Sequence, residues 1–172
     1  LPEEGDSTAH VSVVDAAGRN IFSLEDGSEA PALRHFIAGL QTYVPDLMLV
    51  FAPFVNSFKR YVTGSQAPIN LAWGYDNRTT ALRIPASSAM ARRVENRVAG
   101  ADANPYLVMA ASLAAGLAGL EENLAASEPI TTDGYAQPRT LPRSFDAALE
   151  RMQASAHSRR LLGDRFVTGF CA

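Results

Sequence analysis

Side chains able to bind an anionic ligand are concentrated in one stretch of this chain, Asn56 to Arg97. It contains seven bases, Lys59, Arg60, Arg78, Arg83, Arg92, Arg93 and Arg97, against two acids, Asp76 and Glu95, for a local charge of +5. The whole chain has a net charge of −3, so the remainder carries −8. A nucleic-acid surface is more often broadly basic with a high pI, whereas the pI here is about 5.6. The pattern predicts one site for a small anionic ligand and no nucleic-acid partner.

The end of this stretch alternates charged and uncharged residues, as a β-strand with one polar face does. Successive side chains of a strand point to opposite faces, so Arg93, Glu95 and Arg97 are expected to share one face. A carboxylate between two guanidiniums is either a structural ion-pair ladder, or a site where the arginines hold anions and the carboxylate holds a metal. Spacing alone favours the ladder, because ion pairs of this kind are common in proteins.

Short strands are predicted to carry these charged side chains. Extended segments are expected at 73–76, 81–85 and 92–97. A valine-rich run at 10–14 is followed by a turn, and a return strand is expected from Ile21. Together these segments predict an antiparallel sheet that carries the Arg/Glu face.

Helices are predicted to back that sheet, which gives the α+β fold class. Apolar residues recur at helical spacing over 30–43, with Pro31 in the first turn, and an apolar helix at 46–51 would be capped by Asp46. Asn104 is expected to cap the longest helix, and Ser144 a later helix that ends at Gly163. The longest helix has an apolar stripe, read as core or as a subunit contact, made of Tyr106, Met109, Leu113, Leu117, Leu120 and Leu124.

Length and composition suit one globular domain with a real core. The chain has 172 residues, 47% hydrophobic and 19% charged, and no apolar run approaches 18 residues, so neither a membrane-spanning helix nor a membrane partner is expected. The first residues, LPEEGDS, lack an initiator Met and a basic signal-peptide region, so we interpret the chain as a piece of a longer polypeptide. The single cysteine, Cys171, excludes an internal disulfide, and both features favour a cytoplasmic origin.

Five short motifs follow one another in order: N-S-x-K-R, A-P, W-G-x-x-N-R-[ST]-x-x-x-R-I-P, A-R-R-[IV]-E-x-R and A-N-P-Y-L. In this order and spacing the chain resembles the glutamine synthetase superfamily from about His10 onward. It is most similar to the branch that joins glutamate to amines and polyamines. The resemblance implies that residues 1–172 form the C-terminal part of a catalytic domain, with an N-terminal β-domain and the first part of the catalytic domain upstream.

The resemblance also implies roles for individual residues. ATP-binding positions are His10, Ser12, Arg78, Arg83 and Arg93; Glu95 binds a metal; Arg60, Gln66 and Arg97 bind the substrate glutamate; and Arg83 and Arg97 serve catalysis. The implied cofactors are ATP and Mg²⁺ or Mn²⁺. A planar guanidinium suits the α-carboxylate of glutamate that Arg60 would hold, since it grips a carboxylate in two places.

Two departures from the family pattern bear on chemistry. Thr8 occupies the slot of a metal-binding His and is a poor ligand for these ions. Gln66 occupies the slot of a glutamate that helps receive the ammonium proton, and an amide cannot act as a base. Either another base serves, or the amine arrives neutral, or ammonia is used poorly; without the resemblance, Gln66 is simply a solvated loop residue.

The activity implied by the resemblance is ATP-dependent formation of a γ-glutamyl amide through a γ-glutamyl phosphate. Gln66 and the match to the polyamine branch favour a primary amine or polyamine as acceptor. The implied partners are glutamate, the amine and other copies of the chain in a homo-oligomeric ring, a dodecamer in the family. This piece alone is expected to be inactive. The alternatives are an ordinary glutamine synthetase that uses ammonia, and a non-catalytic homologue that acts as a binding or assembly subunit.

Overall fold

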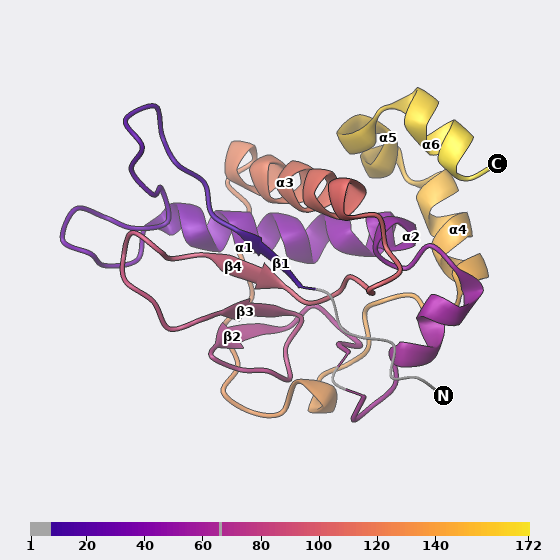
Figure 1. Ribbon diagram of the computed structural model, residues 1–172, viewed down its shortest axis with the longest axis horizontal. Coiled ribbons are helices and arrows are strands. Elements are labelled where there is room, and N and C mark those ends of the chain that lie inside the picture. Colours follow the sequence, from indigo (N-terminus) through magenta and orange to yellow (C-terminus); the bar gives the residue numbers. More distant parts are fainter. Residues whose placement is uncertain (1–7, 66) are drawn as a thin grey trace.

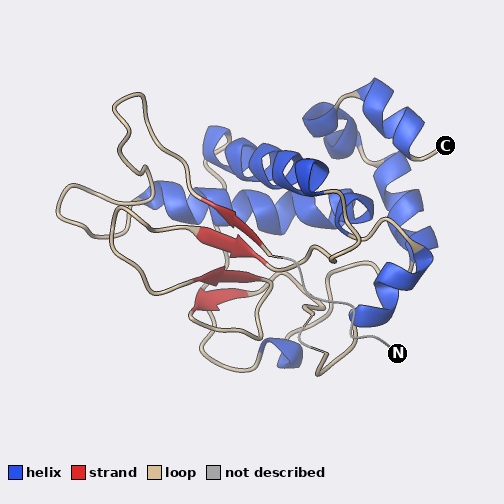
Figure 2. Cartoon of the chain, viewed as in Figure 1, coloured by secondary structure: helices blue, strands red, loops and turns tan. Residues whose placement is uncertain are grey.

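The computed structural model describes residues 8–65 and 67–172, and it contains a small sheet with helices against one side (Figure 1, Figure 2). The strands are β1 (Ala9–Val11), β2 (Trp73–Tyr75), β3 (Leu82–Ile84) and β4 (Val94–Asn96), in the order β1-β4-β3-β2. The predicted α+β class is confirmed, and the three strands expected between 73 and 97 are all present, each shorter than predicted.

The sheet is mixed, so the prediction of an antiparallel sheet is wrong for one strand pair. β4 is antiparallel to β1 and β3, but β2 and β3 run parallel. Parallel neighbours usually need a long crossover. Here each strand has three residues, so the six-residue link 76–81, which can reach about 20 Å, is long enough to return the chain. Asp76 begins the reversal with a positive φ of 47°.

The expected return strand after the first turn is also absent among the described residues. Val14 and Asn20 form only a single bridge, and β1 pairs with β4 instead. The side-chain amide of Asn20 donates to the carbonyls of Met90 and Arg92, at 3.0 and 2.7 Å. These bonds tie the chain after Asn20 to the loop before β4, so that it does not continue as a strand beside β1.

Two long helices, α1 (Pro31–Tyr43) and α3 (Pro105–Glu121), pack against each other and cover one face of the sheet (Figure 1). The predicted cap is confirmed: the Asn104 side chain accepts hydrogen bonds from the backbone N–H groups of Tyr106 and Leu107. The other helical elements are η1 (Val44–Leu47), α2 (Met48–Phe51), η2 (Val55–Arg60), η3 (Gly134–Ala136), α4 (Phe145–Ala154), α5 (Ala156–Leu162) and α6 (Asp164–Phe170). No helix in the described part of the chain is long and apolar enough to cross a membrane.

The buried face of α3 differs from the one predicted. It consists of small residues and one valine: Val108, Ala111, Ser112, Ala115, Gly116, Ala118 and Gly119. Of the predicted stripe, Tyr106 is 83% exposed, Leu117 40% and Met109 38%, so the core interpretation is wrong for these three residues. Small residues occupy the buried face because they let the backbone of α3 approach α1 closely, while Leu113, Leu120 and Leu124 of the predicted stripe are partly buried and pack against the core.

The C-terminal helices are held by the carboxylate of Asp46, which was predicted to cap a helix and does not. It accepts hydrogen bonds from Arg151 Nε at 2.6 Å and Ser155 Oγ at 2.7 Å, and lies 3.2 Å from His157 Nδ1. Burial alone would raise the pKa of Asp46, but the bonds from Ser155 and Arg151 outweigh it and lower the pKa. Ser144 caps α4 as predicted. The helix ends at Ala154, however, and Ser155 caps the next one, so α4 and α5 are separate helices.

We predict that Gly119→Ala destabilises the fold although alanine is the better helix former. A Cβ at Gly119 would lie 2.2 Å from the carbonyl oxygen of His35 and 2.5 Å from the backbone nitrogen of Gly39. Backbone atoms cannot rotate away, so we expect a loss of about 1–3 kcal/mol in urea unfolding. The matched control is Gly169→Ala in α6, where a Cβ meets nothing within 4 Å. That variant should gain roughly 0.5–1 kcal/mol. Equal effects at the two glycines would contradict the proposed close packing.

Candidate active site

One row of side chains crosses the sheet on the face opposite α1 and α3. His10, Glu95 and Arg83 are aligned in register across β1, β4 and β3. The neighbouring positions of β4, Val94 and Asn96, are buried on the other face, and Asn96 donates to Ser112 of α3 at 3.1 Å. The alternation expected of a strand therefore places the uncharged Val94 and Asn96 against the helices and the charged row on the open face.

Glu95 lies between two arginines on this face. Its Oε2 accepts a hydrogen bond from Arg83 Nη1 at 2.8 Å, and its Oε1 is 3.7 Å from Arg97 Nε. Glu95 is 6% exposed and Arg97 9%, so this carboxylate is a buried counter-ion between partly or wholly buried cations. An ion-pair ladder is thus what the described residues form, and any anion or metal site is built on top of it.

Arg83 has a second carboxylate partner, Asp76, at the other end of its guanidinium. Nη2 of Arg83 donates to Asp76 Oδ1 at 2.9 Å, and the backbone N–H of Ala86 donates to the same oxygen at 3.1 Å. The bond from Ala86, followed by those from Arg83, lowers the pKa of Asp76. Burial alone would lower the pKa of Arg83, but Glu95 and Asp76 outweigh it and raise the pKa. The buried Nε of Arg83 has no hydrogen-bond partner within the described residues.

Arg97 holds a backbone turn as well as Glu95. Its Nη1 donates to the carbonyls of Arg78 and Thr80, the second at 3.2 Å, and its backbone N–H donates to Ala81 at 2.9 Å. The side chain therefore fixes the inner side of the turn at 77–80, which carries Arg78.

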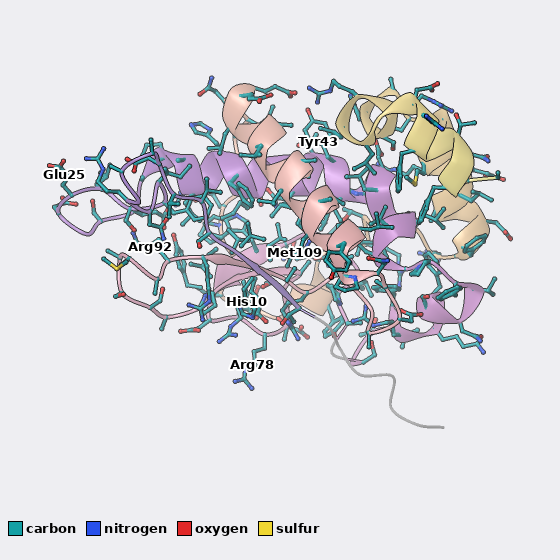
Figure 3. All side chains as sticks on the ribbon, turned by 45° about the horizontal axis from the view of Figure 1, so that its top comes forward. His10, Glu25, Tyr43, Arg78, Arg92 and Met109 are labelled. Carbon is teal, nitrogen blue, oxygen red and sulfur yellow. The ribbon has the colours of Figure 1, made fainter. Side chains whose placement is uncertain are left out.

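The other cations near the row, Arg78 and Arg93, are more accessible. Arg78 is exposed and projects from the edge of the molecule in Figure 3. Arg93 is half-buried, and its Nε lies 3.2 Å from Nδ1 of His10, which is exposed. Ser12 is exposed, one residue beyond β1. Arg93, Glu95 and Arg97 share one face through these contacts, as their spacing predicts.

Arg60 contacts the chain just after β4. Its Nη1 donates to the carbonyl of Val98 at 2.8 Å and to the hydroxyl of Tyr61 at 2.9 Å, and the guanidinium lies 4.8 Å from the centre of the Tyr61 ring. Gln66 lies outside the described residues. Thr8 is exposed, and its hydroxyl is 3.4 Å from His10 Nε2, so it lies at the end of the row where the resemblance places a metal ligand.

Two charged residues have functions that the spacing did not reveal. Asp76 was only counted as one of two acids, yet it orients Arg83; its link to a residue seven positions later depends on the chain reversal after β2. Arg92 donates to the carbonyls of Gly27 and Ser28 and to the Ser23 hydroxyl at 2.6 Å, so it fastens a loop and is no part of the charged row. Spacing does not distinguish the role of Arg92 from that of Arg93. Only the motif A-R-R-[IV]-E-x-R does so, because the resemblance assigns the site role to its second arginine.

The part of the chain that the structure describes does not form a complete metal site by itself. Within residues 8–65 and 67–172 no group of three or more His, Cys, Asp or Glu side chains could hold a metal ion. Glu95 offers one carboxylate, whereas Mg²⁺ takes octahedral oxygen coordination. A metal held at Glu95 would need ligands from elsewhere in the protein.

The fold and this site define an α+β domain with an arginine-rich face around a buried carboxylate. The catalytic-domain family of glutamine synthetase matches residues 3–172, and the chain belongs to that family.

Curated relatives and solved structures agree with this assignment. The chain is 43% identical over 160 residues to the gamma-glutamylputrescine synthetase PuuA of Escherichia coli, covering 91% of this chain and 34% of that protein. It is 40% identical over 169 residues to a gamma-glutamylethanolamide synthetase of Streptomyces coelicolor, covering 97% and 36%. A structure described as apo GmaS without ligand superimposes with a TM-score of 0.83 at 31% identity, covering 96% of this chain and 39% of that one. The chain thus spans about a third of the length of these relatives.

We predict that Glu95→Ala lowers stability by about 3–5 kcal/mol, because it leaves the guanidiniums of Arg83 and Arg97 without their shared counter-ion. Urea unfolding without nucleotide or metal measures this loss, so the result reports on the ion-pair ladder alone. The matched control, Arg19→Ala, breaks an exposed pair with Asp15 and should change stability little. A Glu95→Ala protein as stable as the control would show that the ladder contributes nothing to the fold.

Proposed function

We propose that this chain is the C-terminal part of the catalytic domain of a ligase that joins glutamate to a primary amine or polyamine, driven by ATP through a γ-glutamyl phosphate. The observation that carries the proposal is the charged row on the open face of the sheet, in which Arg83 and Arg97 flank Glu95 and Arg93 contacts His10. Transfer of a phosphoryl group spreads negative charge over its oxygens, and fixed cations stabilise that charge.

The arginines divide the work in this proposal. Arg78, Arg83 and Arg93, with His10 and Ser12, bind ATP; the structure titled as a GmaS/ADP complex, which superimposes on this chain with a TM-score of 0.82 at 30% identity, supports a nucleotide ligand. Arg60 binds the α-carboxylate of glutamate, and Arg97 steadies its γ-carboxyl end. The clamping of Arg83 by Asp76 and Glu95 keeps its charge in place before the substrate arrives.

A divalent cation, Mg²⁺ or Mn²⁺, belongs to the proposal as the partner of the nucleotide phosphates, whose charge it would neutralise. Glu95 is its one ligand among the described residues, and the other ligands would lie elsewhere in the protein.

The amine acceptor is inferred from relatives and from Gln66. Relatives at 40–43% identity are named for putrescine, ethanolamide and isopropylamine products or substrates. Ammonia is mostly protonated near pH 7, so a site that uses it needs an anion and a base, and Gln66 provides neither. An alkyl amine gains about 0.8 kcal/mol per buried methylene from its carbon chain and can bind without that anion.

We also propose a cytoplasmic homo-oligomer, the ring expected from the family. The exposed Tyr106 and Leu117 of α3 supply apolar surface that such a contact would cover.

Nucleotide binding is expected to depend on Arg83. Removing one charge-assisted phosphate contact in Arg83→Ala should cost on the order of 1.5–3 kcal/mol of ATP or ADP affinity, measured by calorimetry on the full-length enzyme. Arg92→Ala is the matched control, because Arg92 holds carbonyls of a loop and is not expected to touch nucleotide. An unchanged nucleotide affinity in Arg83→Ala would count against assigning the ATP site of the family to this chain.

Acceptor choice is tested by phosphate release from full-length enzyme with glutamate and ATP. Putrescine and short monoamines should support faster turnover than ammonium at equal concentration, because Gln66 offers ammonium neither an anion nor a base. Faster turnover with ammonium would identify an ordinary glutamine synthetase. Nucleotide binding without phosphate release for any amine would favour the non-catalytic homologue.

A further inference from the structure

Residues 127–141, called here the edge segment, run along the outer edge of β2 and below the sheet in Figure 1. The backbone N–H of Ile130 donates to the carbonyl of Trp73 at 2.8 Å, and that of Thr140 to the carbonyl of Ile69 at 3.2 Å. The segment is thus anchored to β2 near one end and to the chain before β2 near the other, and the residues between these anchors face two loops of the proposed site.

The first loop is the turn at 77–80, which carries Arg78. The backbone N–H of Gly134 donates to Thr79 Oγ1 at 2.7 Å, and the side-chain amide of Asn77 donates to the carbonyl of Thr132 at 2.9 Å. A Cβ on Gly134 would lie 2.2 Å from the carbonyl oxygen of Thr79, so only glycine permits this approach. The edge segment therefore fixes the outer side of the turn, whose inner side Arg97 holds.

The second loop follows Arg60 and ends at Ala67. The hydroxyl of Tyr135 donates to the carbonyl of Ala67 at 3.1 Å, and the side-chain amide of Asn70 donates to the carbonyl of Gly134 at 2.8 Å. Gly134 and Tyr135 belong to the same short helix, η3, so two adjacent residues contact two different loops. The Asp133 side chain accepts a bond from the Tyr135 N–H at 3.0 Å and fixes the start of this helix.

We propose that the edge segment is a positioning element for both substrates, with Gly134 setting the place of the turn that carries Arg78 and Tyr135 setting the base of the loop that follows Arg60. The inference rests on the proposed function, in which the first loop serves the nucleotide and the second serves glutamate. Neither residue touches substrate; each acts through a backbone group of its loop.

The two adjacent residues are expected to affect different substrates, which a merely structural role would not produce. In full-length enzyme, Tyr135→Phe should raise the KM for glutamate about fivefold, because it removes the hydrogen bond to the carbonyl of Ala67. The affinity for ADP, measured by calorimetry, should not change. Gly134→Ala should weaken ADP binding at least fivefold with a smaller effect on glutamate. The matched control is Tyr75→Phe, which removes a hydroxyl bonded to Glu29 outside both loops and should move neither quantity.

If Gly134→Ala does not fold, Thr79 gives the same test. Thr79→Val removes the hydroxyl that accepts the Gly134 N–H, so it should bind ADP more weakly than Thr79→Ser, which keeps that hydroxyl. Equal effects of the Gly134 or Thr79 change and of Tyr135→Phe on both substrates, with a lower melting temperature, would overturn the positioning role while leaving the proposed function intact. Wild-type enzyme that binds neither ADP nor glutamate would overturn both.

Discussion

The arrangement of the cationic face depends on the carboxylate of Glu95. Two guanidiniums, those of Arg83 and Arg97, lie partly or wholly out of solvent beside it, and buried cations without a counter-ion are strongly destabilising. Because Arg97 also donates to the carbonyls of the turn at 77–80, the position of this turn follows from the same ion pair. One buried charge thus links β3 to β4 and, through Arg97, helps to fix the turn between β2 and β3.

The charged row lies on one face of the sheet because the helices α1 and α3 cover only the other face. α1 and α3 approach through Gly39 and Gly119, whose backbones leave no room for a Cβ, and the residues of β4 alternate between that layer and the open face. Half-covered sheets of this kind can place polar side chains on the uncovered side without losing their core. Because the helices cover only one face of the sheet, α1 and α3 can pack closely on that face while the arginines of the other face stay accessible.

Local patterns predicted local structure well. The caps at Asn104 and Ser144, the helix over 31–43 and the shared face of Arg93 and Glu95 all depend on residues within a few positions of one another. The parallel pairing of β2 and β3, the pairing of Asp46 with Arg151 across 105 positions and the buried alanine face of α3 depend on distant partners. Size, more than hydrophobicity, decided which face of α3 is buried, and periodicity reports only hydrophobicity. The motif order identified the charged row, but Asp76 was missed because its contact with Arg83 exists only after the chain reverses.

The arginines of the site differ in what a ligand must displace to reach them. Arg78 is exposed and Arg93 half-buried, so an anion can approach both from solvent. Arg83 lies between two carboxylates, and Arg97 holds carbonyls of the turn that carries Arg78. An anion that drew Arg97 away would therefore release the turn, whereas one bound by Arg78 and Arg93 would leave the ladder in place. Because breaking the ladder leaves a buried charge unpaired, the path of lower free energy is for the anion to bind the accessible arginines while the clamped ones, still paired, help to stabilise its charge.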